Sequence, residues 1–511
     1  MIRRPSAGNP SAASRSAGSK RARYETSTVP SGRVEQVELV LRRVLTWKLP
    51  ADQGLSAFFK EHKQFGARDR SEIAQALFNV LRHLRRYRRE AQSGQGSLEG
   101  LLAVRGLAAT LEAGRAQALL TPEQTQWAAH CERIDPETLS FSIRYSLPDW
   151  LVESLQSLQD PNTLAQALLV PAPLDLRVNS LKGDRDEVLV TLQAMLAGTA
   201  FSAEPTPYAP TGIRLTGHPP LNRWEMYEKG FVEVQDEGSQ LLAELVAPKR
   251  GEMVIDFCAG AGGKTLALGA MMRSTGRLYA FDISAPRLAK AKPRVARSGL
   301  SNVHPVVIRS EQDDRVSRLA GKAHRVLIDA PCTGVGTLRR NPDLKWRLAP
   351  EELDRLLSQQ ASILHSASRC VRPGGRLVYA TCSFLAKENE GQVNQFLETH
   401  PEFELINAND CLPVPMPNAV GEDGMMRLRP DWHQTDGFFA AVMQRRPQAP
   451  KEATAEATTV IEGKEAKEDK ESKAPKAPKA PKAPKTPKAP KKTAKATEAI
   501  EGSDAREPEE T

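Results

Sequence analysis

Two cysteines follow expected β-strands at points where a parallel sheet would bring them together. Cys332 comes shortly after an apolar run at residues 325–329, and Cys382 directly follows a second run at residues 376–381. Because the carboxyl ends of neighbouring parallel strands meet at one edge of a sheet, we expect both thiols on the same rim. A thiolate is a strong nucleophile, so this pair, with Asp329 close by, predicts covalent catalysis.

A glycine-rich loop follows another expected strand. The run Asp256-Phe-Cys-Ala-Gly-Ala-Gly-Gly-Lys-Thr265 has three glycines that permit a tight turn and close approach to a ligand. Three ligands compete for it. A dinucleotide would need Gly or Ala where Thr265 stands, and a P-loop would need its first Gly where Cys258 stands. S-adenosylmethionine, the third ligand, needs no phosphate cradle.

An acidic residue at the end of the next expected strand narrows this choice. Asp282 ends the run Leu278-Tyr-Ala-Phe-Asp282, where a carboxylate can hold ribose hydroxyls. That contact suits either NAD or S-adenosylmethionine and does nothing for a P-loop. The loop therefore predicts a nucleotide-like ligand without deciding which one.

A methyl-transfer site has a chemical use for thiols. Carbon 5 of cytosine is too weak a nucleophile to attack a sulfonium methyl group directly. A thiolate that adds to carbon 6 makes carbon 5 nucleophilic, and the thiol leaves after methyl transfer. A carboxyl group such as Asp329 could assist protonation of the ring nitrogen as negative charge develops.

The elements that must position these residues alternate between strands and helices. Short apolar runs are expected as strands at residues 253–256, 278–282, 306–308, 325–329 and 376–381, with helical segments between them. This alternation favours an α/β fold with a parallel, doubly wound sheet. Ligands of such sheets bind at the carboxyl ends of the strands.

The segments that precede this sheet differ in character. Residues 34–140 show apolar residues at helical spacing, and residues 141–240 combine short strand-like runs with one helix, Arg185–Leu196. The second helical stretch ends in a basic cluster, Arg82–Arg89, which is either a solvated helix end or an RNA-facing patch. The sheet domain then spans residues 241–445.

The two ends of the chain are expected to be disordered. Residues 1–33 are rich in Ser, Gly and Arg, a composition that also occurs in transit peptides, and residues 446–511 are rich in Lys, Ala and Pro. Between Lys473 and Lys495 there are nine lysines and no acid. Such an arm attracts polyanions without reading their sequence, or it serves only as a solvated tail.

Composition excludes several classes of protein. No run of 18 or more apolar residues exists, so we expect no membrane span. The six cysteines lack the spacing of a zinc ribbon and are too few for a disulfide framework, which favours a reducing, cytoplasmic location and no metal. We also expect a monomer.

Several runs together resemble the RNA cytosine-5 methyltransferases of the RsmB/NOP (NSUN) family, and the bacterial RsmB-like members in particular. The resemblance covers about residues 141–445, and residues 34–140 resemble that family's helical NusB-like domain more loosely. The runs are Val234-Gln-Asp-Glu-Gly-Ser-Gln240, Asp256–Lys264, Asp329-Ala-Pro-Cys332, Arg339-Arg-Asn-Pro-Asp-Leu-Lys-Trp346, Tyr379-Ala-Thr-Cys-Ser383 and Asp436-Gly-Phe-Phe439.

The resemblance implies a Rossmann-like class I methyltransferase core, an RNA substrate, most of all rRNA, and S-adenosylmethionine as cofactor. It also implies residue roles. Cys382 would be the nucleophile, Cys332 would help to resolve the covalent adduct, and Asp329 would lie near both cofactor and base. The residues implied to bind the cofactor are Cys258, Ala259, Gly260, Ala261, Gly262, Gly263, Lys264, Asp282 and Asp329.

This sequence departs from the family pattern at two places. The usual Cys-Ala-Ala-Pro-Gly-Gly-Lys loop has Ala261 in place of Pro, which should loosen it. The acid that usually follows the third strand is not clear, although Glu311 could replace it. Two other classes of function remain open, namely an RNA-binding assembly protein without turnover and a P-loop NTPase.

Overall fold

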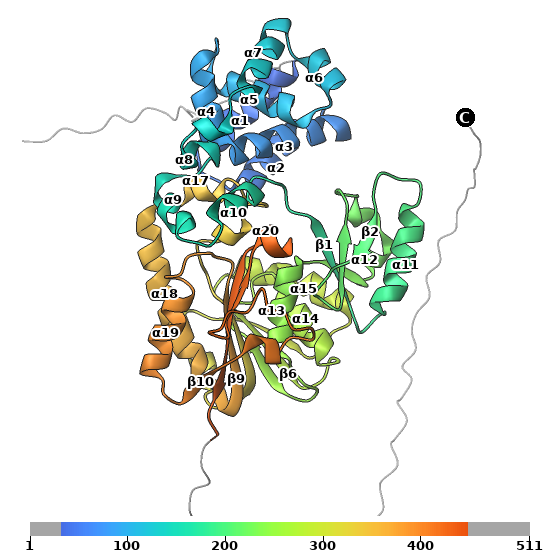
Figure 1. The fold of residues 1–511 in the computed structure, drawn as a ribbon. Coiled ribbons are helices and arrows are strands. Elements are labelled where there is room, and N and C mark those ends of the chain that lie inside the picture. The colour runs from blue at the N-terminus through green and yellow to red at the C-terminus, as the bar shows by residue number, and fades with distance from the viewer. Residues whose placement is uncertain (1–31, 448–511) are drawn as a thin grey trace, which may run out of the picture. The chain divides into compact units, whose positions relative to one another are not determined.

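A computed structural model describes residues 32–447 of the chain (Figure 1). Most of the two segments predicted to be disordered, 1–33 and 446–511, lies outside this range. The first prediction is wrong at its inner end, because Arg33 begins helix α1 (Arg33–Val44) and its buried guanidinium pairs with Glu72 at 3.1 Å. The second is wrong at Arg446, whose backbone N–H donates to the carbonyl of Glu402 at 2.8 Å.

Residues 34–140 form helices, as the sequence predicts, and these helices pack around α5 (Leu98–Thr110). The elements are α1, α2 (Ala51–Glu61), α3 (Ala67–Arg82), α4 (Leu84–Glu90), η1 (Ala91–Ser93), α5 (Leu98–Thr110), α6 (Ala113–Leu119), α7 (Pro122–Glu132) and η2 (Pro136–Thr138). Ser97 caps α5 by accepting from the N–H of Gly100. A Cβ on Gly106 would lie 2.7 Å from the Ala76 carbonyl oxygen, so α3 and α5 pack closely only with glycine there.

Residues 141–240 begin with helices and continue as a small antiparallel sheet of order β2-β3-β1-β4. The elements are α8 (Phe141–Arg144), α9 (Asp149–Gln156), α10 (Pro161–Ala167), β1 (Leu174–Val178), α11 (Arg185–Leu196), β2 (Ala203–Pro205), β3 (Gly212–Leu215), η3 (Leu221–Arg223), α12 (Glu225–Glu228) and β4 (Val232–Val234). The bounds predicted for α11 are confirmed. Leu151 and Leu164 pack in one cluster with Val335 and Leu338, so α9 and α10 contact the segment that follows the main sheet's fourth strand.

The main sheet has the order β10-β12-β9-β8-β5-β6-β7, with β11 beside β12. Its strands are β5 (Met253–Asp256), β6 (Arg277–Asp282), β7 (Val303–Val307), β8 (Ala323–Asp329), β9 (Val371–Thr381), β10 (Phe403–Ile406), β11 (Met426–Leu428) and β12 (Phe438–Arg445). Strands β5 to β9 pair in parallel, as predicted, whereas β10, β11 and β12 pair antiparallel. The Rossmann-like α/β fold is therefore confirmed with an antiparallel edge.

Three strands start two or more residues earlier than their apolar residues indicate. β9 begins at Val371, five residues before the predicted 376, and β8 begins at Ala323, two residues before the predicted 325. β7 begins at Val303, three residues before the predicted start at Val306, and it includes Pro305. Proline cannot donate to a neighbouring strand, so it is tolerated at a sheet edge. β7 is an edge strand and is largely solvent-accessible, which explains why its sequence lacks a clear apolar signal.

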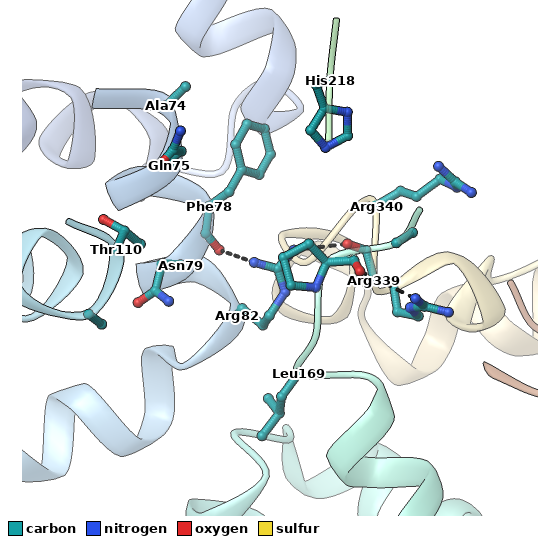
Figure 2. A pocket seen from close by; sticks show the side chains of 13 residues that line it. Ala74, Gln75, Phe78, Asn79, Arg82, Thr110, Leu169, His218, Arg339 and Arg340 are labelled. Carbon is teal, nitrogen blue, oxygen red and sulfur yellow. Dashed lines mark hydrogen bonds between the residues drawn. The ribbon is translucent and has the colours of Figure 1, made fainter. Parts of the chain in front are cut away.

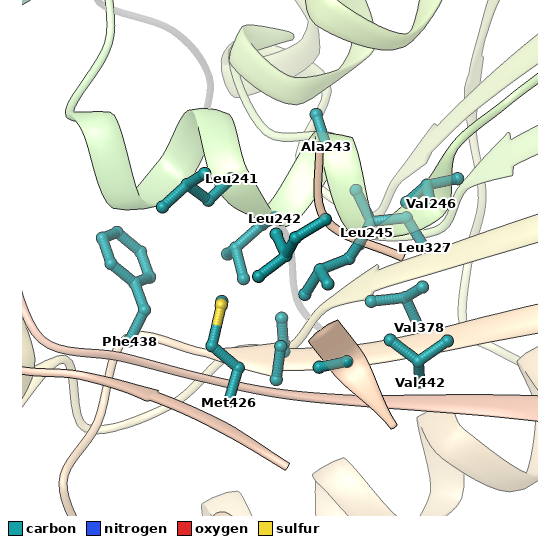
Figure 3. Packing of buried hydrophobic residues seen from close by; sticks show 14 of the residues in the cluster. Leu241, Leu242, Ala243, Leu245, Val246, Leu327, Val378, Met426, Phe438 and Val442 are labelled. Atoms are coloured by element: carbon teal, nitrogen blue, oxygen red, sulfur yellow. The ribbon is translucent and has the colours of Figure 1, made fainter. Parts of the chain in front are cut away.

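Helices cover both faces of the main sheet (Figure 1). One face packs on α13 (Glu237–Val246) and α14 (Gly263–Met271), and Figure 3 shows Leu242 and Leu245 of α13 meeting side chains of the strands. The other face packs on α18 and α19. The remaining helices are α15 (Ala285–Ser298), α16 (Asp314–Ser317), η4 (Val335–Thr337), α17 (Leu344–Arg347), α18 (Pro350–Ser368), α19 (Glu390–Thr399), η5 (Ala408–Asp410) and α20 (Pro430–His433).

The strand order reverses direction between β5 and β8. From β5 the chain runs outward to β6 and β7, then returns to β8 on the other side of β5 and continues to β9. Ligands of open α/β sheets bind at such a switch point, beyond the carboxyl ends of the strands. The ends of β6 and β8 and the loops after β5, β8 and β9 carry the candidate site residues.

Candidate functional site

The two thiols predicted to approach each other do so. β8 and β9 are parallel neighbours, with Asp329 opposite Ala380, which confirms the expected strand pairing. The Sγ atoms of Cys332 and Cys382 lie 3.4 Å apart. The structure therefore brings both sulfur atoms to one point beyond the ends of these strands.

A buried carboxylate, Glu388, holds the two thiol-bearing loops together. It accepts hydrogen bonds from the backbone N–H of Thr333 at 2.8 Å and from its hydroxyl at 2.5 Å. It also accepts from Gln360 at 3.0 Å and from the hydroxyl of Ser383. Thr333 and Ser383 each follow a cysteine directly, so Glu388 fixes the distance between the two sulfur atoms.

Sequence reasoning missed Glu388. The residue lies in the run Lys387-Glu-Asn-Glu390, which has the composition of an exposed helix start, yet its side chain is fully buried. Only the pairing of β8 with β9 brings its donors together, and this tertiary contact leaves no local signal.

We expect Glu388→Ala to lower the free energy of unfolding by about 3 kcal/mol or more. Several buried donors would lose their acceptor, and a buried donor without a hydrogen-bond partner destabilises the fold by roughly 1–3 kcal/mol. Glu388→Gln keeps one acceptor oxygen and should lose less. Chemical denaturation checks both. Glu398→Ala, at an exposed position of α19, is the matched control and should change little. Equal stability of the Glu388→Ala and control variants would contradict this role.

The glycine loop is fixed by Asp282 at the end of β6. Gly260 has φ +55° and Gly262 has φ +83°, values that favour glycine, and a Cβ on Gly262 would lie 2.9 Å from that of Ala291. The Gly260 N–H donates to Oδ2 of Asp282 at 2.8 Å, and the N–H of Ser284 donates to Oδ1 at 2.7 Å. Asp282 thus joins the loop after β5 to the loop after β6.

An ion pair connects the glycine loop to the thiol rim. Lys264 Nζ lies 2.8 Å from Oδ2 of Asp329. Burial opposes the charge of Lys264, but the charge of Asp329 and its hydrogen bond together raise the pKa of the ammonium above its usual value. Lys264 is therefore a stable cation at the rim.

Asp256, at the end of β5, directly precedes the same loop. Burial raises the pKa of Asp256 to about 7, although a hydrogen bond from Thr265 at 2.6 Å partly offsets this.

Two cavities meet at this rim. One, of about 450 Å³, is lined by Asp282, Glu311 and both thiols, and the other, of about 350 Å³, is lined by the glycine loop and Lys264. Cys258, Arg287 and Asp329 line both. All but one of the residues implied to bind the cofactor line these cavities. Asp282 lines only the first cavity, and Gly262 lines neither and caps α14. The residues that line only the second cavity are Ala259, Gly260, Ala261, Gly263 and Lys264.

Glu311 lies where the sequence left the identity of an acid open. It lines the larger of these two cavities, together with Arg309 and Ser310, and accepts a hydrogen bond from Ser362 at 2.6 Å. The cavity therefore has carboxylates from the ends of both β6 and β7.

Two cysteines at the rim, Cys332 and Cys258, have raised pKa values. The hydrogen bond with Cys382, together with burial, raises the pKa of Cys332 well above its usual range. Burial and the nearby charge of Asp329 raise the pKa of Cys258 in the same direction. Both stay protonated thiols at neutral pH, which makes them poor nucleophiles.

Arg340 joins three runs that lie far apart in the sequence. Its Nη2 donates to Asp236 at 2.8 Å and its Nε donates to Asp436 at 2.6 Å. These residues belong to the runs Val234–Gln240, Arg339–Trp346 and Asp436–Phe439, and all three line the smaller cavity. Sequence reasoning identified the runs but not their contact.

The basic cluster Arg82–Arg89 is mostly engaged within the protein. Arg82 donates to the carbonyl of Arg339, Arg85 pairs with Asp149 and Arg86 pairs with Glu90. Arg88 and Arg89 remain exposed. Most arginines of the cluster are therefore bound to groups within the protein, and only Arg88 and Arg89 are left as an exposed basic surface.

Within residues 32–447, every helix is too short or too polar to span a bilayer. No group of three or more His, Cys, Asp or Glu side chains in the range is arranged to hold a metal ion.

Two family models match this chain, and several known proteins are similar to it. A family model described as 16S rRNA methyltransferase RsmB/F matches residues 243–444, and a model of the RsmF/B-like ferredoxin-like domain matches residues 147–222. A probable ribosomal RNA small subunit methyltransferase B of Synechocystis sp. is 33% identical over 317 residues, which span 61% of this chain and 70% of that protein.

Two further proteins are similar. The probable ribosomal RNA small subunit methyltransferase B of Bacillus subtilis is 32% identical over 59% of this chain and 67% of its own. Among solved structures, a methyltransferase homolog protein from Pyrococcus horikoshii superposes with a TM-score of 0.52 at 28% identity, over 61% of this chain and all of that one.

Proposed function

This chain belongs to the RsmB/F family of rRNA methyltransferases, and we propose that it transfers a methyl group to carbon 5 of a cytosine in rRNA through a covalent adduct with Cys382. Methylation of rRNA and the use of S-adenosylmethionine follow from the family. The target atom and the adduct are our proposal. The observation that carries it is the pair of thiols, 3.4 Å apart, on the wall of one cavity.

The larger of the two rim cavities suits S-adenosylmethionine. Its volume of about 450 Å³ is within the range of small-molecule sites. We propose that Asp282 and Glu311 accept hydrogen bonds from the nucleoside part, and that the loop 258–264 contacts the methionine part. When bound, the cofactor supplies an electrophilic methyl group on a sulfonium. Asp329, shared by both cavities, would then lie between cofactor and base.

The protein's residues divide the covalent chemistry between them. The thiolate of Cys382 forms a bond to carbon 6, and the carbon 5–carbon 6 electron pair becomes available at carbon 5. Ring nitrogen 3 takes up a proton from solvent, and the Asp329 carboxylate holds that proton by a hydrogen bond. Carbon 5 then forms a bond to the methyl group, whose bond to sulfur breaks, so that S-adenosylhomocysteine would leave. Loss of the carbon 5 proton to water restores the double bond and breaks the bond to Sγ of Cys382, and the nitrogen 3 proton returns to solvent. In this release step the neutral Cys332 thiol, 3.4 Å from the departing sulfur, stabilises it by a hydrogen bond.

The raised pKa of Cys332 fits a role in release of the adduct and not in attack on the base. Because its pKa is raised by the hydrogen bond with Cys382 and by burial, Cys332 does not compete as a nucleophile. The Lys264–Asp329 ion pair keeps the carboxylate in place at the rim. A cytosine must leave its base stack to reach these groups, so the enzyme should hold a flipped or single-stranded base.

Transfer of a labelled methyl group to unmodified small-subunit rRNA tests this function. We expect label in the RNA and, after digestion to nucleosides, 5-methylcytidine. RNA binding without any transfer would instead support an assembly protein without turnover. Label in another nucleoside would leave the enzyme a methyltransferase and refute the proposed target atom.

Asp282→Ala should weaken S-adenosylmethionine binding about ten- to hundredfold, because it removes a charged acceptor and frees the Gly260 N–H, and such hydrogen bonds contribute roughly 1.5–3 kcal/mol. Calorimetry measures the affinity, and a thermal melt separates a local from a global effect. Asp314→Ala, at an exposed acid on α16, is the control and should bind as the wild type does. Unchanged affinity for Asp282→Ala would remove Asp282 from the site.

We further propose that residues 34–140 form an RNA-binding domain of the NusB-like kind, that residues 141–240 form the small α+β module and that residues 241–445 carry the chemistry. A monomeric state and a cytoplasmic location remain predictions.

A further inference from the structure

A third cavity, of about 770 Å³, lies where the N-terminal helices meet the segment around Arg339 (Figure 2). Its walls come from α3 and α5, from residues 169–172 and from the loop after β3. Figure 2 shows Phe78 and His218 reaching it from different parts of the chain. The rRNA methyltransferase chemistry argued above makes no use of this space.

Two of its lining residues are buried arginines, and neither forms a salt bridge with a carboxylate of residues 32–447. Arg82 is 5% exposed and Arg339 is 8% exposed. Arg82 donates to the backbone carbonyls of Phe78 at 3.3 Å and Arg339 at 2.8 Å. Arg339 donates to three backbone carbonyls, those of Pro171 at 3.3 Å and of Gln434 and Thr435 at 3.4 Å. The Nε atom of each arginine is buried without a hydrogen-bond partner.

The lining of the cavity adds positive charge and no carboxylate. None of the residues that line the cavity is Asp or Glu. The nearby carboxylates Asp236 and Asp436 are bound to Arg340. Burial and the charge of Arg339 lower the pKa of Arg82 to about 10, and burial and the charge of Arg82 lower the pKa of Lys345 to about 7. Buried cations of this kind are unfavourable unless an anion pairs with them.

The rest of the lining suits a nucleotide. Phe78, Leu169 and Pro171 offer apolar surface, while Gln75 and Asn79 carry amide groups. Aromatic side chains stack on unpaired bases with little regard to base identity. The volume is within the range of small-molecule sites.

The cavity shares a lining residue with one of the cavities of the rim. Arg340 lines both this cavity and the 350 Å³ cavity of the glycine loop. The latter shares Asp329 with the cavity that holds Cys332 and Cys382. The cavity beside α3 is therefore next to the glycine-loop cavity, which in turn is next to the cavity of the two thiols.

From these observations, and resting on the proposed function, we propose that this cavity binds one nucleotide of the substrate RNA outside the target cytosine. Its phosphodiester pairs with Arg82 and Arg339, and its base packs against Phe78. The site fixes the RNA relative to the rim where the target base reacts, and it takes no part in the chemical step.

A charge placed on the cavity wall tests this without disturbing the buried arginines. Gln75 lies on an exposed turn of α3 and lines the cavity, so Gln75→Glu should repel a phosphodiester and Gln75→Lys should attract it. We expect Gln75→Glu to raise the Kd for transcribed small-subunit rRNA on the order of tenfold in filter binding. Gln75→Lys should bind as tightly as the wild type or more tightly, with a steeper salt dependence.

Gln126→Glu is the matched control, since Gln126 is exposed on α7 and lies outside the cavity lining. Equal Kd values for Gln75→Glu and Gln126→Glu overturn the inference, whether or not methylation occurs. A Kd shift confined to Gln75→Glu, in an enzyme that produces no 5-methylcytidine, supports the site and refutes the proposed target atom. The two proposals therefore fail separately.

Discussion

Cys382→Ala is expected to abolish methyl transfer, by a factor on the order of 10⁴ or more, and to form no covalent adduct with RNA. Cys382 directly follows β9, with its sulfur 3.4 Å from that of Cys332 on the wall of the cavity proposed for S-adenosylmethionine. Because carbon 5 of cytosine is a weak nucleophile, removal of the attacking thiolate leaves no alternative route of comparable rate.

Labelled methyl transfer and denaturing electrophoresis measure this effect together. Cys411→Ala provides the matched control, because Cys411 is partly buried and packs against the core away from the rim. The control should retain wild-type activity. Substantial methylation by Cys382→Ala, with RNA binding intact, would show that the thiol mechanism is wrong for this chain.

Cys332→Ala is expected to accumulate an RNA–protein adduct that survives denaturing electrophoresis. In this variant Cys382 can still attack and carbon 5 can still accept the methyl group, but the release step is impaired. The position of Cys332 supports a separate role, because its sulfur lies 3.4 Å from the sulfur that bonds to the base, and the hydrogen bond between them raises the pKa of Cys332. Digestion of the RNA should return the shifted band to the position of the free protein.

The opposite pattern would be equally informative. An adduct with Cys382→Ala and none with Cys332→Ala would mean that the two roles are exchanged. No adduct with either variant, together with lost methylation in both, would place both thiols in the reaction but would refute release as the role of Cys332.

The sequence predicts the centre of this site well because its residues stand at the ends of strands. Asp282, Asp329 and Cys382 each lie at or directly after an apolar run, and the parallel pairing of β8 with β9 follows from the strand–helix alternation. The antiparallel strands β10 and β11 were not predicted, because short strands at a sheet edge have weak apolar patterns.

Polar side chains with tertiary partners are harder to predict. Glu388 resembles a surface acid in the sequence but is buried beneath both thiol loops. Arg33 and Arg82 resemble solvated basic residues but pack against Glu72 and the carbonyl of Arg339. Whether such a side chain faces solvent depends on which elements pack together, and that information is absent from the local pattern.

Bisulfite sequencing of rRNA tests the central claim most directly, since it reads the methylated atom and its position together. RNA from cells that carry the wild-type gene should contain a cytosine that resists deamination. The same cytosine should be converted in RNA from cells that lack the gene or carry only Cys382→Ala. If the purified enzyme transfers label to this RNA and every cytosine is still converted, the methyl group is not on carbon 5 and the account is wrong.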